Sequence, residues 1–439
     1  MGTDKKDKFG LWSIVLLGIN GIIGTGIFLL PNRAYALMGP SSLLILLFDA
    51  FLAGCLALCF AEVAGFFSRN GGPYLYAKAA FGDFVGYEVG VLKLVVTIIA
   101  WAAMAVGFAT ALGAAFPFFA GDTMKNLIAA VLIGGLTIMN IAGVKISKIL
   151  NNLMTISKLV PLCVFIAVGL FFVNGSNFTP FVPTHMADGA FANAAITMFF
   201  AYTGFEAIAV AAEDFKDPKK DLPRGIILTM IIVTIIIIYM LVVGISIGIL
   251  GPDLAVDKAP IQTAFGRAVG PVGAYFILLG TLFSMGGINL AESFIAPRAC
   301  TSLAEDGMLP AFLNRRTSWG TPWASSVVVA ILSILLAWSG SFTTLAAISA
   351  VSRFTQYLPT VLSVIVFRRK WKDRERTYKI PGGIFVPVVA FLTSLWMLSN
   401  AKPMQLVWGL GGILVIAPYY LVYKKKKAEG LVKDHDEEA

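Results

Sequence analysis

The chain has 439 residues, of which 58% are hydrophobic and 13% charged, and its formal net charge is +9. Soluble domains are about 45–50% apolar and about 25% charged, so this composition excludes an ordinary water-soluble globule. Scarce charge and only four cysteines also exclude a disordered chain and a disulfide scaffold, and they leave an all-α polytopic membrane protein as the prediction.

Twelve runs of residues are long and apolar enough to cross the hydrocarbon core, which takes about 20 residues. They are predicted as transmembrane helices at residues 11–38, 41–68, 84–116, 124–143, 146–173, 189–212, 224–250, 271–303, 322–340, 342–367, 383–400 and 403–423. No soluble domain fits between them. We expect no cleavable signal peptide, because the first apolar run continues past Pro31 without a small-residue cleavage site.

The first span is rich in glycine. Four glycines precede a proline: Gly18, Gly21, Gly24 and Gly26, then Pro31. Each costs a helix about 1 kcal/mol relative to alanine, so a break in the middle of the span is predicted. Polar backbone groups exposed by a break are tolerated only where they line a protein cavity. The alternative is close packing of small residues against a neighbouring helix.

The sixth span carries a second candidate break at Gly204, followed by the carboxylate of Glu206. Gly24 and Gly204 are 180 residues apart, close to the length of five spans. Interrupted helices at matching places in two halves indicate a transporter with inverted repeats. We therefore predict one transmembrane domain (residues 1–423), with repeats at 11–173 and 189–367 and two appended helices at 383–423.

These breaks suggest a kind of ligand. An outer half-helix beginning near Thr25 and Gly26 would offer free N–H groups, which favour a carboxylate. Unwound carbonyl oxygens from both breaks would receive an ammonium group. A site with both features suits a zwitterionic amino acid.

Six segments carry a recognisable pattern in order along nearly the whole chain: residues 24–31 (GTGIFLLP), 70–76 (NGGPYLY) with 81–82, 200–206 (FAYTGFE), 217–224 (DPKKDLPR), 305–310 (EDGMLP) and 378–383 (YKIPGG). In these segments the chain resembles bacterial amino-acid permeases of the amino acid–polyamine–organocation superfamily. The resemblance implies a five-plus-five inverted-repeat (LeuT-like) fold of twelve helices with helices 1 and 6 broken. It also implies sodium-independent amino-acid exchange or proton symport.

The resemblance further implies a substrate site, whose expected members are Ile22, Gly24, Thr25, Gly26, Phe200, Thr203, Gly204 and Glu292. The substrate carboxylate would contact the amides of Thr25 and Gly26. Its ammonium group would meet the carbonyl oxygens of Ile22, Phe200 and Thr203.

Two aromatic positions follow from the same resemblance. Phe200 is the expected gate over bound substrate, at a position where relatives often have tryptophan. In span 7, Ile237 corresponds to a tyrosine common in relatives, and Tyr239 follows two residues later. The chain departs from the family pattern there.

Eight charged residues lie inside the predicted spans, four of each sign: Asp49, Glu62, Glu206, Glu292, Lys93, Lys158, Arg298 and Arg353. A charged residue inside a membrane span is costly, so each of these residues is a candidate functional residue. Glu62 and Lys93 are expected near the cytoplasmic ends, where snorkelling explains a charge. Asp49 has no partner that the sequence identifies, and a polar contact between helices is one explanation for it.

Lys158, midway along span 5, is too deep in the membrane to snorkel. In the permeases that the chain resembles, such a lysine replaces the Na⁺ of sodium-dependent cousins and bridges spans 1 and 8. Two roles fit it: coupling, by exchanging a proton during transport, or a permanently charged structural pin.

Two acidic residues leave the substrate class open. Three roles fit Glu206: it can hold the unwound segment open, relay protons as a coupling residue, or attract a basic substrate. Glu292 lies near the position of a substrate-facing aromatic residue in some relatives. It would favour a cationic substrate if it faces the site, and a neutral one if Arg298 or Arg353 neutralises it.

The basic residues separate by location. Twenty-five of the 34 Lys and Arg residues lie in the termini and alternate loops, and four lie in the opposite loops. This excess marks the cytoplasmic side, so both termini are predicted to be cytoplasmic, with residues 424–439 as a charged tail. The basic excess orients the helices in the bilayer, and no nucleic-acid partner is expected.

Enzymatic and metal functions find little support. All four cysteines fall within apolar spans and are expected to be buried free thiols: Cys55, Cys59, Cys163 and Cys300. Two histidines offer little for a zinc site, and no Walker-type motif is present for ATP. We expect no catalytic residue, metal or cofactor.

The sequence therefore predicts a cell-membrane transporter that moves amino acids, with neutral ones as the expected substrates and the proton as a candidate coupling ion. The alternative is a cationic amino-acid or polyamine antiporter. The sequence leaves the oligomeric state open.

Overall fold

The computed structural model describes residues 10–68, 71–143, 148–210, 215–234, 237–374 and 376–429. This part of the chain is helical and contains no β-strand. Its α-helices are α1 (Leu11–Ile22), α2 (Thr25–Leu29), α3 (Pro31–Met38), α4 (Ser42–Ala64), α5 (Pro73–Phe81), α6 (Asp83–Ala115), α7 (Asp122–Ile141), α8 (Lys148–Gly169), α9 (Ala190–Phe199), α10 (Glu206–Val210), α11 (Pro218–Thr234), α12 (Ile237–Leu250), α13 (Pro260–Val269), α14 (Pro271–Glu305), α15 (Trp323–Ser339), α16 (Phe342–Lys370), α17 (Phe385–Ser399), α18 (Pro403–Leu410), α19 (Gly412–Ile416) and α20 (Tyr419–Ala428).

Short 3₁₀ segments connect several of these helices. They are η2 (Gly39–Ser41), η3 (Pro117–Phe119), η4 (Leu170–Phe172), η5 (Gly175–Phe178), η6 (Phe200–Tyr202), η8 (Gly251–Ala255) and η9 (Ala311–Asn314).

Eight helical segments in the described chain are long and apolar enough to cross a membrane: Leu11–Leu29, Pro31–Ala64, Asp83–Ala115, Asp122–Ile141, Ile238–Ala255, Pro271–Glu305, Phe342–Lys370 and Pro403–Ala428. Four shorter apolar helices accompany them: Ile156–Phe172, Ala190–Tyr202, Trp323–Ser339 and Phe385–Ser399. Each of these segments overlaps one of the predicted spans. The protein is therefore an all-helical multi-pass membrane protein.

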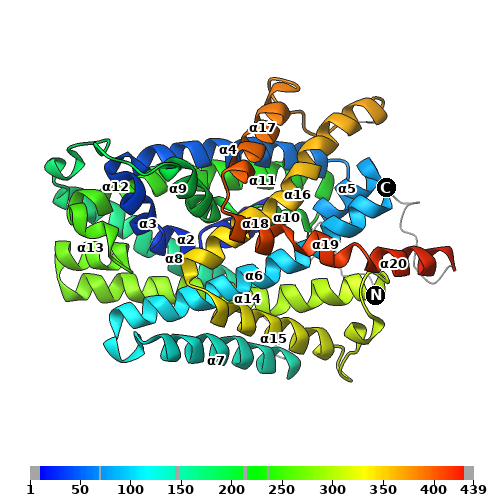
Figure 1. Cartoon of the computed structure of the whole chain (residues 1–439), viewed down its shortest axis with the longest axis horizontal. Helices are drawn as coiled ribbons and strands as arrows, with labels where there is room; N and C mark the ends of the chain where they lie inside the picture. Colours follow the sequence, from blue (N-terminus) through cyan, green and yellow to red (C-terminus); the bar gives the residue numbers. More distant parts are fainter. Residues whose placement is uncertain are drawn as a thin grey trace.

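The two longest helices, α6 and α14, run lengthwise through the middle of the molecule and pack against each other (Figure 1). Helix α16 also packs against α6, and α7 and α15 lie side by side along one edge. Helices α12 and α13 lie at one end of the long axis, and α5 and α20 lie at the opposite end. Long helices that contact one another along their length give the broken helices a fixed surface to pack on.

Small residues on α14 let α8 approach closely. A Cβ atom added at Gly280 would lie 2.2 Å from Cγ of Pro161, and one added at Gly287 would lie 2.9 Å from Sδ of Met154. Small residues are the usual means by which membrane helices pack tightly. This packing holds α8, and with it Lys158, against the interior of the bundle.

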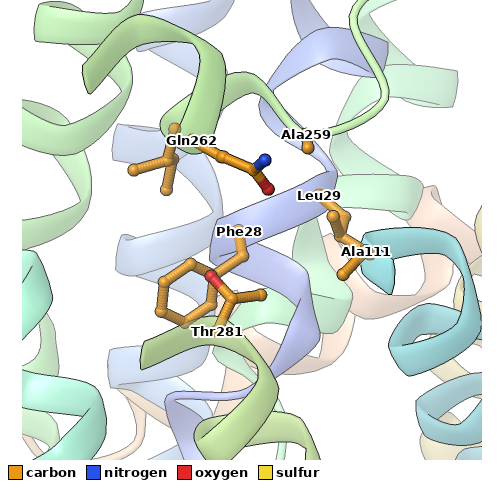
Figure 2. Close-up of a pocket in the computed structure, with 7 residues that line it drawn as sticks. Phe28, Leu29, Ala111, Ala259, Gln262 and Thr281 are labelled. Carbon is orange, nitrogen blue, oxygen red and sulfur yellow. The ribbon is translucent and has the colours of Figure 1, made fainter. Parts of the chain in front are cut away.

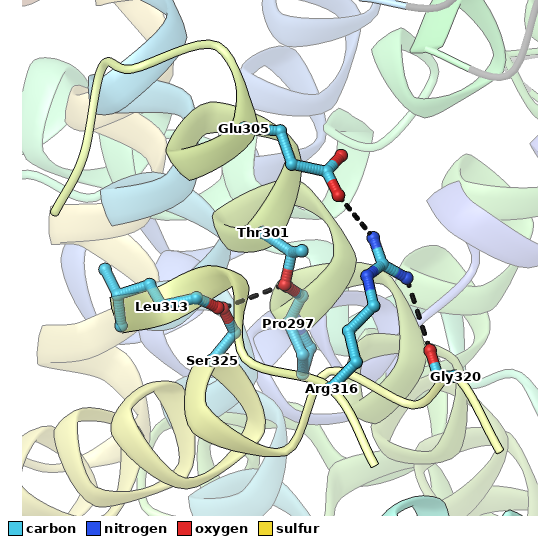
Figure 3. A network of polar contacts seen from close by, with 7 residues as sticks. All are labelled: Pro297, Thr301, Glu305, Leu313, Arg316, Gly320 and Ser325. Atoms are coloured by element: carbon cyan, nitrogen blue, oxygen red, sulfur yellow. Dashed lines mark hydrogen bonds and ion pairs between the residues drawn. The ribbon is translucent and has the colours of Figure 1, made fainter. Parts of the chain in front are cut away.

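A polar network ties the end of α14 to the start of α15 (Figure 3). Arg316 forms a 2.7 Å ion pair with Glu305, the first residue of the 305–310 segment. Thr301 donates to Ser325 at 2.9 Å, and Ser325 donates to the carbonyl oxygen of Leu313 at 2.6 Å. The network gives this sequence segment a structural role at a helix end.

Candidate substrate site

The first span is interrupted, as its glycines predict. Helix α1 ends at Ile22, Ile23 and Gly24 have extended backbone, and α2 begins at Thr25. The N–H groups of Thr25 and Gly26 lie in the first turn of α2, where a helix leaves its donors without intrahelical partners. All of these residues are buried or nearly so.

The sixth span is interrupted as well. After η6, Thr203 has extended backbone, and Gly204 has a φ of +113° before α10 begins at Glu206. Such a φ is readily available only to glycine. The N–H of Gly204 donates a 2.9 Å hydrogen bond to Oε2 of Glu206, so the carboxylate stabilises the unwound backbone.

The two interruptions meet in space. A Cβ atom added at Gly204 would lie 2.3 Å from the carbonyl oxygen of Gly21, and one added at Gly26 would lie 2.7 Å from Cα of Ala201. Spans 1 and 6 are therefore in contact backbone to backbone, with no room for a side chain between them. The fold brings together two breaks that are distant in sequence.

Apolar side chains from α6 and α14 flank the first break. A Cβ atom at Gly24 would lie 2.8 Å from Cδ1 of Ile288 and 3.4 Å from Cε of Met104. The hydroxyl of Thr25 is 2.7 Å from Sδ of Met104. Sequence reasoning missed Met104 and Ile288, because an apolar residue in an apolar span carries no signal of its own.

Phe200, the expected gate, is 3% exposed and packs edge-on against Phe342 with ring centroids 6.0 Å apart. Its carbonyl oxygen accepts hydrogen bonds from the N–H of Thr203 at 3.3 Å and the hydroxyl of Thr203 at 2.8 Å. In this conformation the side chain is closed into the core and the carbonyl oxygen is engaged within its own segment.

Span 7 also reaches the second break. The side chain of Ile237 lies outside the described residues, but Tyr239 is buried and donates a 3.0 Å hydrogen bond to the carbonyl oxygen of Ala201. Tyr239 thus contacts the broken span from α12, two residues beyond Ile237.

The side chain of Lys158 is completely buried and points at the first break. Its ammonium group donates to the carbonyl oxygens of Asn20 at 3.0 Å and Ile23 at 2.8 Å. These carbonyls lie at the end of α1, where helix geometry leaves acceptors without partners. The expected bridge reaches span 1, but within the described chain Lys158 makes no hydrogen bond to α14.

Glu206 is paired with Arg353. Oε1 of Glu206 forms an ion pair with Nη1 of Arg353 on α16, and the hydroxyl of Tyr357 donates to Oε2 at 3.1 Å. Both charged side chains are almost fully buried. The carboxylate of Glu206 is therefore neutralised by an arginine and engaged in holding the break.

Glu292 has a different neighbour. Lys93 on α6 interacts with it electrostatically, whereas Arg298 lies 5.3 Å from the ring of Phe294. Glu292 follows Ile288 by one helical turn on α14, and its Oε2 atom is buried without a hydrogen-bond partner in the described structure. Lys93, which the sequence placed at a helix end, is therefore a basic neighbour of Glu292.

The snorkelling interpretation of Glu62 is wrong. Glu62 is 1% exposed and accepts two 2.6 Å hydrogen bonds from Arg368 and one of 2.8 Å from the N–H of Ile380. In the same connection between α16 and α17, burial and then the nearby Glu62 carboxylate raise the pKa of Tyr378. Glu62 fastens the end of α4 to α16 and to the 378–383 segment.

Cys163 is exposed, in contrast to the predicted buried thiol, because it lies on an outward face of α8. The other three cysteines are buried and free. The charged tail is described as far as residue 429, and residues 430–439 lie outside the described part.

A small pocket lies beside the end of α2 (Figure 2). Phe28 and Leu29 of α2, Gln262 of α13 and Thr281 of α14 line it, and its volume is about 10 Å³. That volume suits about one water molecule. The pocket between α2 and α13 is thus too small for an amino acid in this conformation.

Comparison with known proteins places the chain among transporters. The amino acid permease family matches residues 9–413. The uncharacterized transporter Rv1979c of Mycobacterium tuberculosis is 33% identical over 82% of this chain and 80% of its own length. The branched-chain amino acid permease BcaP of Bacillus subtilis is 29% identical over 97% of this chain and 94% of its own length. Cationic amino acid transporter 5 of Arabidopsis thaliana is 30% identical over 94% of this chain and 74% of its own length.

Proposed function

The chain belongs to the amino acid permease family, and from this premise we propose a sodium-independent secondary transporter of neutral amino acids. It works by alternating access, as an exchanger or a proton symporter. The observation that carries the neutral substrate class is the ion pair between Glu206 and Arg353, which neutralises the carboxylate nearest the two breaks.

We propose that twelve spans form a five-plus-five inverted repeat, with residues 11–173 and 189–367 as the repeats and 383–423 appended. The twelve apolar helical segments support this topology. The matching position of the two breaks supports it as well. One break lies in span 1 and the other in span 6, which are the first spans of the two proposed repeats. The protein would lie in the cell membrane with both termini in the cytoplasm, as the lysines and arginines of alternate loops indicate.

The substrate carboxylate would bind the N–H groups of Thr25 and Gly26. The substrate ammonium would bind carbonyl oxygens of Ile22, Phe200 and Thr203. Because Thr203 engages the carbonyl of Phe200 in this closed conformation, its hydroxyl must turn away before the ammonium binds.

Glycines at both breaks support this arrangement. Gly24 and Gly204 leave the backbone without side chains at the places where polar main-chain groups are freed. Phe200 would act as the gate, since it lies on the 3₁₀ turn that ends at the second break. A buried gate and a buried break correspond to a closed state of the transport cycle.

The walls of the site favour an apolar substrate side chain. Met104 and Ile288 flank Gly24, and neither carries a charge. Lys158 supplies positive charge to the carbonyls of Asn20 and Ile23, the place where a sodium ion would otherwise bind. A fixed ammonium there supports transport without sodium and keeps Lys158 a candidate coupling residue together with Glu206.

A cationic amino-acid or polyamine antiporter is the second candidate. Glu292 favours it, because one of its buried oxygens has no hydrogen-bond partner in the described chain and would accept a cationic group. The resemblance to cationic amino acid transporter 5 points the same way, and the resemblance to BcaP points to neutral substrates.

Uptake into proteoliposomes tests the proposal. Purified protein is reconstituted, and counterflow of radiolabelled amino acids is measured with and without sodium. We expect saturable exchange of neutral amino acids that is independent of sodium. Stronger competition by arginine, ornithine or putrescine than by leucine, alanine or serine would favour the antiporter, and no exchange across the full panel would refute amino-acid transport.

A further inference from the structure

Asp49, on α4, differs from Glu62 and Glu206, two other buried acids of the spans. It is 0% exposed, and both of its carboxyl oxygens are buried without a hydrogen-bond partner in the described structure. Glu62 and Glu206 are also buried, but each is paired with an arginine. An ionised carboxylate without a partner is costly in an apolar interior, whereas a neutral carboxylic acid is tolerated far more easily.

Among the described residues, the titratable side chain that interacts with Asp49 is Tyr202. Tyr202 of η6 interacts with it electrostatically and donates a 3.0 Å hydrogen bond to the carbonyl oxygen of Leu46, on the same helix. Tyr239 of α12 packs edge-on against Tyr202 with ring centroids 5.1 Å apart.

No positively charged side chain of the described residues interacts with Asp49. Helices α3, α9, α10, α11, α12, α16 and α17 also pack against α4, and within the described residues none of them supplies a charged group that interacts with Asp49. No lysine, arginine or histidine of the described chain therefore offsets a negative charge at this position.

The covering tyrosine belongs to the part of the molecule that transport would move. Tyr202 is the last residue of η6, directly before the break at Thr203 and Gly204, and η6 also carries Phe200. Tyr202 is bonded to α4 at Leu46, three residues before Asp49, so a displacement of η6 from α4 would separate this tyrosine from the carboxyl.

We propose that Asp49 is a proton-binding site of the transport cycle, holding a proton while η6 covers it and exchanging that proton when η6 moves away. This inference rests on the proposed transport function and deepens it. When water reaches Asp49 from one side, a carboxylate oxygen gains one proton. Tyr202 then closes over the neutral acid, and the proton leaves when the site next opens on the other side. A proton bound preferentially in one conformation shifts the population of conformations, so proton and substrate become coupled.

Transport measurements separate coupling from transport itself. Asp49→Asn keeps the shape of the side chain and removes the titratable proton. In proteoliposomes, the variant is expected to retain counterflow but to lose accumulation of substrate driven by an acidic exterior. Wild-type protein accumulates substrate under the same gradient. Gradient-driven accumulation in Asp49→Asn equal to wild type would overturn the proposal.

Glu88 provides the matched control. It is also a buried acid whose two oxygens lack hydrogen-bond partners in the described part, but it lies on α6 and interacts electrostatically with Tyr87. Glu88→Gln is expected to accumulate substrate as wild type does. Equal loss of accumulation in both variants would point to a general effect of removing a buried acid and would overturn the specific assignment to Asp49.

Infrared spectroscopy tests whether Asp49 is protonated, and it requires no transport assay. A carbonyl stretching band of a protonated carboxyl is expected at neutral pH in wild type and in Glu88→Gln, and its intensity should fall in Asp49→Asn. An unchanged band in Asp49→Asn would overturn the proposal.

If Asp49→Asn fails to fold, Asp49→Leu replaces it, because a neutral site in apolar surroundings accepts leucine. Absence of any amino-acid exchange in wild type would instead refute the proposed function, and the infrared result would still decide whether Asp49 holds a proton.

Discussion

The ammonium group of Lys158 lies 2.8 Å from the carbonyl oxygen of Ile23, the residue at which α1 breaks. A second hydrogen bond, of 3.0 Å, joins it to Asn20. A bound monovalent cation would meet the same carbonyl oxygens. In this chain the positive charge is covalently attached to α8, so the first break is stabilised without an ion from solution.

Lys158→Ala is expected to reduce counterflow by at least about ten-fold, because a hydrogen bond from a charged donor contributes about 1.5–3 kcal/mol and two are lost. The measurement is initial exchange rate in proteoliposomes at matched protein content. Lys125→Ala is the control, because Lys125 forms a 3.2 Å surface pair with Asp122 and should leave the rate unchanged. Sodium-stimulated uptake in both wild type and Lys158→Ala would contradict the role given to this lysine.

Gly204→Ala should destabilise the protein and abolish transport. The φ of +113° strains any other residue by about 1–3 kcal/mol, and the added Cβ would lie 2.3 Å from the carbonyl oxygen of Gly21. Thermal unfolding in detergent measures the loss. Gly54→Ala, on α4, is the comparison: its Cβ meets nothing within 4 Å, and in a helix it should be neutral or stabilising by about 0.5–1 kcal/mol. Equal melting temperatures for the two variants would show that the contact between the breaks is dispensable.

Glu206→Gln is expected to cost about 3–5 kcal/mol of stability, because it leaves the guanidinium of Arg353 buried without its counter-ion. The double variant Glu206→Gln/Arg353→Gln should recover part of that loss. Arg267→Gln removes one partner of an exposed pair with Asp253, and it should cost less than about 1 kcal/mol. A double variant less stable than Glu206→Gln alone would indicate that Arg353 is held by other groups.

Ile288→Ala should change substrate preference and leave the capacity for exchange intact. The side chain of Ile288 lies against Gly24, and its removal enlarges the wall beside the first break. One methylene group more or less in an apolar pocket changes substrate discrimination by about 1–3 kcal/mol. The preference for bulky neutral amino acids over alanine should therefore rise at least about ten-fold. Competition against a labelled substrate gives the ratio. Leu279→Ala, on an exposed face of the same helix, should leave this ratio unchanged. An identical change of the ratio in both variants would show that the effect comes from the packing of α14 and not from the wall beside the break.

Local sequence was sufficient to find the helices and their interruptions. Apolar runs of about 20 residues are a property of composition, and a cluster such as Gly18 to Gly26 weakens a helix wherever it occurs. For the same reason the start of a half-helix at Thr25 was predictable. Glu206 was recognisable as functional because a carboxylate in an apolar span needs a partner.

The identity of each partner was not predictable in this way. Glu62 is hydrogen-bonded to Arg368, a residue distant in sequence. The sequence predicted a charge at a helix end, whereas in the structure Glu62 is buried and holds α4 to α16. Lys93 proved to be the neighbour of Glu292 for the same kind of reason. Cys163 shares its apolar setting with the buried cysteines, and only the face of α8 on which it lies distinguishes it.

The sequence by itself determined that the chain is a multi-pass helical membrane protein and that spans 1 and 6 break, because hydropathy and glycine content act through neighbouring residues. The tertiary structure alone decided that the breaks touch at Gly21 and Gly204, that Arg353 neutralises Glu206, and that the carboxyl of Asp49 is buried without a hydrogen-bond partner in the described part of the chain. Electrostatic pairing and close packing depend on distances between residues far apart in the chain. Those distances are set only when the helices pack together.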